Sequence, residues 1–168
     1  MDYDASGLEE LKKRADAGDP KALLELGIYY LGDEGREPSI DEAMGCFREA
    51  ALSGEPVAAF NVGLAAAMGD GVPQSWDEAA YWIGISAGRG LPEAQYMFGG
   101  MYEGGLGVEE SDVEAAKWYA EAGKQGHTKA LLCLADMYDE GRGVPKNPDK
   151  AAEIRKYLRG GMITIDGA

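Results

Sequence analysis

Histidine and cysteine, two residue types that often perform acid–base, nucleophilic or metal chemistry, are sparse in this chain of 168 residues. His127 is the only histidine, and a general base or metal ligand normally acts together with neighbouring polar groups. We therefore interpret His127 as a structural residue just before a helix. The cysteines, Cys46 and Cys133, form no closely spaced pair, which is typical of small buried side chains in a reducing compartment.

Two loop-like stretches resemble ligand-binding motifs without meeting their requirements. GGLGVEE at 104–110 is glycine-rich, but it lacks the Gly-Lys-Ser/Thr ending and the preceding strand of a phosphate-binding loop. DEGREPSIDE at 33–42 is rich in carboxylates, but it lacks the ligand spacing of a calcium-binding EF-hand. We expect no catalytic residue, no cofactor and no metal site, and we interpret the chain as a protein that is not an enzyme.

Glycine and alanine recur along the chain at a constant spacing of 36 residues. One column of glycines contains Gly35, Gly71, Gly107 and Gly143. Two columns of alanines contain Ala22, Ala58, Ala94 and Ala130, and Ala43, Ala79, Ala115 and Ala151. Because repeats of about 20–50 residues determine the architecture of a chain, we interpret the sequence as four copies of one structural unit.

Each copy has apolar residues at the helical period and no two-residue alternation, which predicts two helices per copy and an all-α fold. We expect the first helices at roughly 20–31, 56–68, 92–103 and 128–139. The candidate N-caps of the second helices are Ser39, Ser75, Ser111 and Asn147. Small residues in the first helices would let the two helices of a hairpin approach closely, at Gly27, Gly63, Gly99 and Ala135.

The most specific motif is EAQYMFGGMYEGGLGVEESDVEAAKWYAEAGKQG, from Glu93 to Gly126. Its spacing of Ala94, Gly99, Tyr102 and the later Trp-Tyr pair resembles the Sel-one-like repeat (SLR), a relative of the tetratricopeptide repeat. The resemblance extends over residues 7–161. It implies a right-handed α–α superhelix, or solenoid, that binds other proteins as an adaptor or regulator without a cofactor.

We therefore expect one solenoid domain over residues 1–168, with four helical hairpins and an additional N-terminal helix. The expected segments are a capping helix at 5–18, repeats at 19–54, 55–90, 91–126 and 127–161, and a C-terminal tail at 162–168.

The formal net charge of −14 disfavours nucleic acids and anionic membranes as partners. The charge either serves solubility alone or attracts a basic partner, and the partner we expect is a protein or peptide that is basic or amphipathic. No run of about 18 apolar residues is present, and the N-terminal stretch MDYDASGLEE is acidic where a signal peptide would be basic and then apolar. We expect a cytoplasmic monomer with no signal peptide in the chain as given.

One face of the first helices is expected to line the concave surface of the solenoid and to bind the partner. Its candidate residues are Ile28, Val57, Asn61, Leu64, Met68, Glu93, Met97, Asp136 and Glu140. The middle of this face is apolar and its ends are charged, which suits an amphipathic or extended peptide with basic ends. The alternative is that Leu64 or Met97 packs inside the next repeat.

Three function classes follow from these observations. The first is a non-enzymatic interaction module that acts as an adaptor or regulatory scaffold. The second is an acidic inhibitor or immunity-type protein that neutralises a basic enzyme or toxin by charge complementarity. A hydrolase is a remote third class, because no catalytic constellation can be named.

Overall fold

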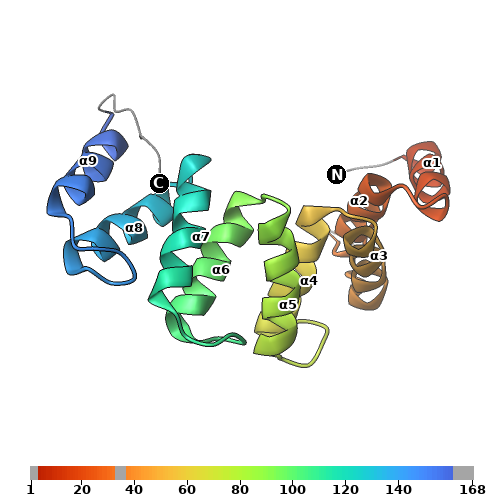
Figure 1. Cartoon of the computed structure of the whole chain (residues 1–168). Coiled ribbons are helices and arrows are strands. Elements are labelled where there is room, and N and C mark those ends of the chain that lie inside the picture. Colours follow the sequence, from red (N-terminus) through yellow and green to blue (C-terminus); the bar gives the residue numbers. More distant parts are fainter. Residues whose placement is uncertain (1–3, 33–36, 161–168) are drawn as a thin grey trace. The chain divides into compact units, whose positions relative to one another are not determined.

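The protein is described here by a computed structural model, which covers residues 4–32 and 37–160 (Figure 1). The described residues form nine α-helices and no β-strand, which confirms the all-α fold. The expected C-terminal tail at 162–168 lies outside the described residues. The helices are α1 Ala5–Asp16, α2 Pro20–Tyr30, α3 Ile40–Leu52, α4 Pro56–Met68, α5 Trp76–Gly88, α6 Pro92–Gly104, α7 Asp112–Lys124, α8 Thr128–Glu140 and α9 Pro148–Leu158.

The helices start in the register that the sequence predicts. The first helices of the four copies begin at Pro20, Pro56, Pro92 and Thr128, at intervals of 36 residues. Proline is favourable in a first helical turn, because its missing N–H would have no partner there. The second helices begin at the same interval, at Ile40, Trp76, Asp112 and Pro148.

Three of the four candidate N-caps bind the backbone of the helix that follows. Ser75 accepts a hydrogen bond from the Glu78 N–H at 3.2 Å, and Asn147 accepts one from the Lys150 N–H at 3.0 Å. The Ser111 hydroxyl likewise accepts a hydrogen bond from the Glu114 N–H, at 3.3 Å. Ser39 makes no such bond, contrary to expectation. Its φ of −115° differs from the −151° of Ser75 and Asn147 and the −158° of Ser111.

Close packing within each hairpin depends on the small residues of the first helix. A Cβ atom added at Gly99 would lie 2.8 Å from the Tyr119 ring, and one added at Gly63 would lie 2.6 Å from Ile83. Carbon atoms do not normally approach so closely, so a larger residue would require the Tyr119 ring, the Ile83 side chain or the helix that carries it to shift. This explains why glycine stands in the middle of these helices despite its cost of about 1 kcal/mol relative to alanine.

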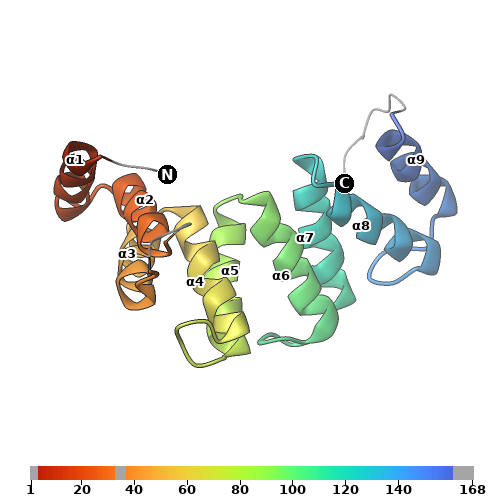
Figure 2. The same cartoon turned by 180° about the vertical axis from the view of Figure 1, so that it is seen from behind.

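The chain divides into two compact units, residues 1–89 and 90–168. The first unit contains α1 to α5, in which α2 packs on α3 and α4 packs on α5 as hairpins (Figure 2). Phe47, Val62 and Ile83 are buried in its core. The buried Ser86 hydroxyl donates a 2.8 Å hydrogen bond to the Pro56 carbonyl, so this polar group is satisfied.

The second unit contains the hairpins α6–α7 and α8–α9. Its core includes Tyr119, Met137 and Ile154. His127 caps α8, since its Nδ1 accepts a 3.2 Å hydrogen bond from the Ala130 N–H. The imidazole also stacks on the Tyr96 ring, with 4.7 Å between the ring centroids. His127 therefore has a structural role at the start of this helix.

Candidate functional site

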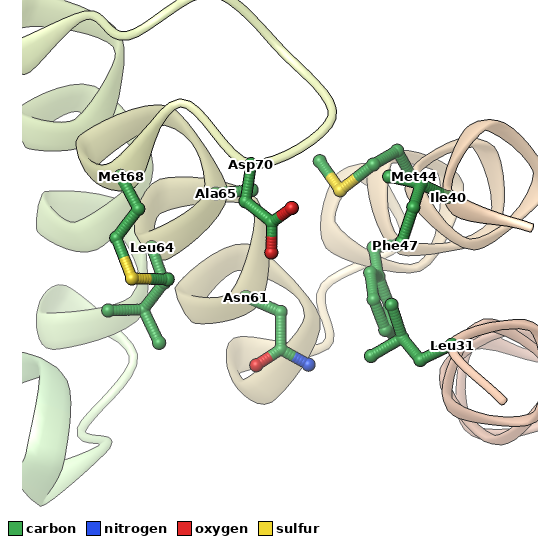
Figure 3. A pocket seen from close by; sticks show the side chains of 9 residues that line it. All are labelled: Leu31, Ile40, Met44, Phe47, Asn61, Leu64, Ala65, Met68 and Asp70. Atoms are coloured by element: carbon green, nitrogen blue, oxygen red, sulfur yellow. The ribbon is translucent and has the colours of Figure 1, made fainter. Parts of the chain in front are cut away.

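The first unit contains a pocket that is bounded by α2, α3, α4 and the loop after α4 (Figure 3). Its volume is about 160 Å³. The lining residues are Leu31, Ile40, Met44, Phe47, Asn61, Leu64, Ala65, Met68 and Asp70. Seven of these nine side chains are apolar, and the two polar ones, Asn61 and Asp70, lie between the apolar walls in Figure 3.

The positions of the lining residues follow from helix geometry. Ile40, Met44 and Phe47 are spaced four and three residues apart, so they share one face of α3. Asn61, Leu64 and Met68 share one face of α4 for the same reason, and these three belong to the predicted binding face.

The loop after α4 places Asp70 at the pocket. Gly71 follows it with a φ of +69°, a conformation that favours glycine. A Cβ atom at Gly71 would also collide with the Ile40 side chain. The loop is therefore packed tightly on the start of α3, beside the pocket wall.

The pocket has a buried floor and an exposed rim. Phe47 and Met44 are 2% and 5% exposed, whereas Leu31 and Met68 are 43% and 66% exposed. Within the described part of the chain, the Asp70 carboxylate has no hydrogen bond or ion pair, and the Asn61 amide has none either. Both polar groups are therefore available to a ligand that enters the pocket.

Two other predicted residues of the first unit do not line the pocket. Ile28 is 39% exposed on α2, and Val57 is half-buried in the first turn of α4. Leu64 is also half-buried, so it is neither a fully packed core residue nor a fully exposed one.

The predicted residues of the second unit have different surroundings. Glu93 is exposed and Met97 is half-buried on α6. Asp136 accepts a 2.6 Å hydrogen bond from Arg155, and Glu140 accepts a 2.6 Å bond from Arg142. These two carboxylates are therefore already neutralised by arginines of the same unit.

The nine pocket positions recur 72 residues later, which is two repeats along the chain, and five of the residues there form a hydrogen-bonded ionic network: Glu103, Asp112, Tyr119, Glu140 and Arg142. The equivalent residues are Glu103, Asp112, Ala116, Tyr119, Cys133, Asp136, Met137, Glu140 and Arg142. Arg142 Nη1 donates to Glu103 Oε1 at 2.9 Å and to Asp112 Oδ1 at 3.1 Å. The Tyr119 hydroxyl donates to the other Glu103 oxygen at 2.7 Å. The network joins α6, α7 and the loop after α8.

The titration behaviour of the network is that of a structural cluster. Burial, followed by the hydrogen bond to Glu103, raises the pKa of Tyr119. Hydrogen bonds to Glu140 and Glu103 raise the pKa of the Arg142 guanidinium. Burial also raises the pKa of the Cys133 thiol, and the same holds for Cys46. Neither cysteine is an activated nucleophile, because nucleophilic cysteines require a lowered pKa.

Across residues 4–32 and 37–160, no group of three or more His, Cys, Asp or Glu side chains is placed to hold a metal ion. Over the same segments, no helix is long and apolar enough to cross a membrane.

Six pocket residues were not predicted as binding residues: Leu31, Ile40, Met44, Phe47, Ala65 and Asp70. The predicted binding face lies on the first helices alone, whereas the pocket is also lined by the second helix α3 and the loop after α4. A comparison of repeats 72 residues apart indicates three of them, because Leu31, Ile40 and Asp70 stand opposite residues of different charge, namely Glu103, Asp112 and Arg142.

Antiparallel hairpins that start every 36 residues define a helical-repeat protein. The family model of the Sel1 repeat matches residues 20–55, 56–91, 92–127 and 129–153. The chain therefore belongs to the Sel1 repeat family, as its motifs indicate. The Sel1 repeat is a protein-interaction scaffold, and proteins of this family are generally non-catalytic.

Solved structures support the same fold. A protective antigen of uropathogenic Escherichia coli strains, which displays an SLR fold, is 39% identical with a TM-score of 0.82. The match covers 92% of this chain but 33% of the antigen, so this chain spans about a third of its length.

A Sel1 repeat protein of Oxalobacter formigenes is 41% identical with a TM-score of 0.73, over 77% of this chain and 97% of that protein. Cysteine rich protein B of Helicobacter pylori is 20% identical with a TM-score of 0.54, over 73% of this chain and 88% of that one, and shows a similar fold. The comparison with curated proteins returns no match.

Proposed function

We propose that this chain is a non-enzymatic interaction module that binds a protein or peptide through the pocket of its first unit. In this role it acts as an adaptor or regulatory scaffold. The observation that carries the proposal is the difference between equivalent positions of the two units. Arg142 and its carboxylate partners fill these positions in the second unit, whereas the first unit keeps an apolar pocket with two unpaired polar groups among the described residues.

The size of the pocket favours a side chain of a macromolecule over a whole small ligand. Small-molecule sites usually measure about 300–1,000 Å³, and this pocket measures about 160 Å³. Burial of one leucine or methionine side chain contributes roughly 1.5–3 kcal/mol. A single apolar side chain of the partner, buried in the pocket as an anchor, therefore gives modest affinity. The partner needs further contacts outside the pocket.

The lining residues suit an anchor of this kind. Met44 and Met68 have unbranched, flexible side chains that adjust to different apolar shapes. The Asn61 amide offers both a donor and an acceptor, so it can bind the N–H and C=O groups of a peptide backbone. Of the other predicted residues, Ile28, Val57, Glu93 and Met97 remain candidates for peripheral contacts. Asp136 and Glu140 are weaker candidates because each already binds an arginine.

An acidic inhibitor of a basic enzyme or toxin is a second candidate function. The supporting observation is the charge of residues 1–89, which contain 17 acidic and 7 basic residues and so contribute −10 of the total −14. The negative electrostatic potential of this charge would accelerate the association of a basic protein. A monomeric state and a cytoplasmic location stay predictions under both functions.

Selection of peptides from a random 12-residue phage library tests the proposal. The pocket variant is Leu64→Glu. The matched control is Leu132→Glu on α8, also the first helix of its repeat, where the Leu132 side chain is 43% exposed. We expect peptides that bind the wild type and the control but not the pocket variant. Selected peptides that bind Leu64→Glu as well as the wild type would contradict the proposal.

A second variant keeps this test decisive if Leu64→Glu lowers the melting temperature. Met68 is 66% exposed on the rim of the pocket, so Met68→Glu should leave the fold intact. It should still weaken peptide binding, because the charge would replace part of the apolar rim.

A further inference from the structure

Asp70 and Arg142 occupy the same loop position of repeats that lie 72 residues apart, and their charges are opposite. Arg142 reaches back to Glu103 and Asp112, which precede it by 39 and 30 residues. The same steps back from Asp70 lead to Leu31 and Ile40, and both line the pocket. Asp70 thus stands where a guanidinium stands in the second unit, beside apolar side chains in place of carboxylates.

The neighbouring positions differ in the same way. In the second unit the Tyr119 hydroxyl binds Glu103 at 2.7 Å. The equivalent residues of the first unit are Phe47 and Leu31, which have neither a hydroxyl nor a carboxylate. The second unit therefore supplies a cation and its anions from its own chain. The pocket of the first unit has an anion, and no described residue supplies the cation.

We infer that the partner supplies this cation, so that the pocket recognises a peptide segment with an apolar residue and a Lys or Arg within two residues of it. This inference rests on the proposed function. The apolar side chain lies against Met44, Phe47 and Leu64, and the basic side chain binds the Asp70 carboxylate at the rim. In an extended segment, residues two apart point to the same side, which lets both side chains face the pocket.

The charge of the surrounding unit acts in the same direction. With a net charge of −10 over residues 1–89, basic segments are attracted and acidic segments are repelled. An acidic residue of the peptide near the apolar anchor would face Asp70 directly. The repulsion between the two carboxylates would disfavour peptides of this kind.

A charge-swap experiment tests the inference. The same random 12-residue library is selected on the wild type, on Asp70→Lys and on Glu49→Lys. Glu49 is exposed on α3 and does not line the pocket, so Glu49→Lys changes the net charge of the unit by the same amount. We expect Lys or Arg near the apolar residue of peptides selected on the wild type and on Glu49→Lys. In peptides selected on Asp70→Lys we expect Asp or Glu near the apolar residue instead.

Affinities of the selected synthetic peptides, measured by fluorescence polarisation, make the test quantitative. Asp70→Asn should weaken binding of a basic peptide by about 1.5- to 5-fold, the range of an exposed ion pair. Asp70→Lys should weaken it further, and Glu49→Lys should change it less. Pocket-dependent peptides that lack a basic residue, or that bind Asp70→Lys as tightly as the wild type, would overturn the inference but leave the proposed function standing. If no selected peptide depends on Leu64, both fail.

Discussion

The Tyr119 hydroxyl donates a 2.7 Å hydrogen bond to the Glu103 carboxylate and so joins α7 to α6. Burial and this bond raise the pKa of Tyr119. The folded state therefore keeps the phenol protonated at a pH where the unfolded chain, with a tyrosine pKa of about 10, has released its proton. This linkage makes stability depend on pH in the alkaline range.

The first prediction concerns this pH dependence. Because the pKa is raised on folding, the stabilisation is fully present below about pH 10 and is lost as the pH rises towards the folded pKa. Tyr119→Phe removes the titrating group, so its melting temperature should fall less steeply between about pH 9.5 and 11 than that of the wild type. Thermal melts over this range measure the two slopes, and equal slopes would contradict the prediction.

The second prediction concerns the glycines of the first helices. Gly99→Ala places a Cβ atom 2.8 Å from the Tyr119 ring, whereas Gly100→Ala places one 3.6 Å from the Tyr119 hydroxyl, an ordinary contact. We expect Gly99→Ala to lower the free energy of unfolding by up to about 2 kcal/mol, because an overpacking cost of about 1–3 kcal/mol is offset by a helix-propensity gain of about 1 kcal/mol. Gly100→Ala should be neutral or stabilising. Urea denaturation measures both, and equal effects would show that close approach is not the cause.

The third prediction concerns the helix caps. Ser75→Ala removes the hydrogen bond to the Glu78 N–H and should cost about 1 kcal/mol of stability. Ser39→Ala removes no cap hydrogen bond, so its cost should be much smaller. Chemical denaturation of the two variants compares the same substitution at equivalent repeat positions. A loss at Ser39 as large as that at Ser75 would show that Ser39 does cap α3 in solution.

The fourth prediction concerns Arg142. Its substitution by leucine, the residue at the equivalent position 106, removes the bonds to Glu103, Asp112 and Glu140. The arginine side chain is 38% exposed, so solvent screening keeps the expected loss of stability to about 0.5–1 kcal/mol. The loss should shrink in about 1 M salt, where charges are screened within a few ångströms. A loss that is the same in low and high salt would indicate packing, not charge.

The helices could be predicted well from the sequence because the same pattern of residues recurs in each repeat. Pro56 and Pro92 mark helix starts at the same register, and Gly99 indicates a close contact that the Tyr119 ring confirms. Such features depend on local periodicity and on residue size, and both can be read from one repeat. They do not require knowledge of the side chains that meet across repeats.

The pocket could be predicted only in part, because it depends on residues from two successive repeats and a loop. Asn61, Leu64 and Met68 were found through their shared helix face. Asp70 was not found, since its role depends on the neighbouring Leu31 and on the contrast with Arg142. Ser39 does occupy the N-cap position of α3, but the expected side-chain hydrogen bond is absent, and its φ of −115° differs from the −151° of Ser75.

The central claim is that a peptide binds in the pocket of the first unit. The most direct measurement is a nuclear magnetic resonance titration of the protein, labelled at its methionine methyl groups, with a peptide selected on the wild type. The pocket residues Met44 and Met68 lie in the first unit, and the core residue Met137 lies in the second. The Met44 and Met68 methyl signals should shift until the peptide saturates the protein, while the signal of the buried Met137 stays unchanged. Shifts confined to Met97 or Met137, with Met44 and Met68 unaffected, would contradict the central claim.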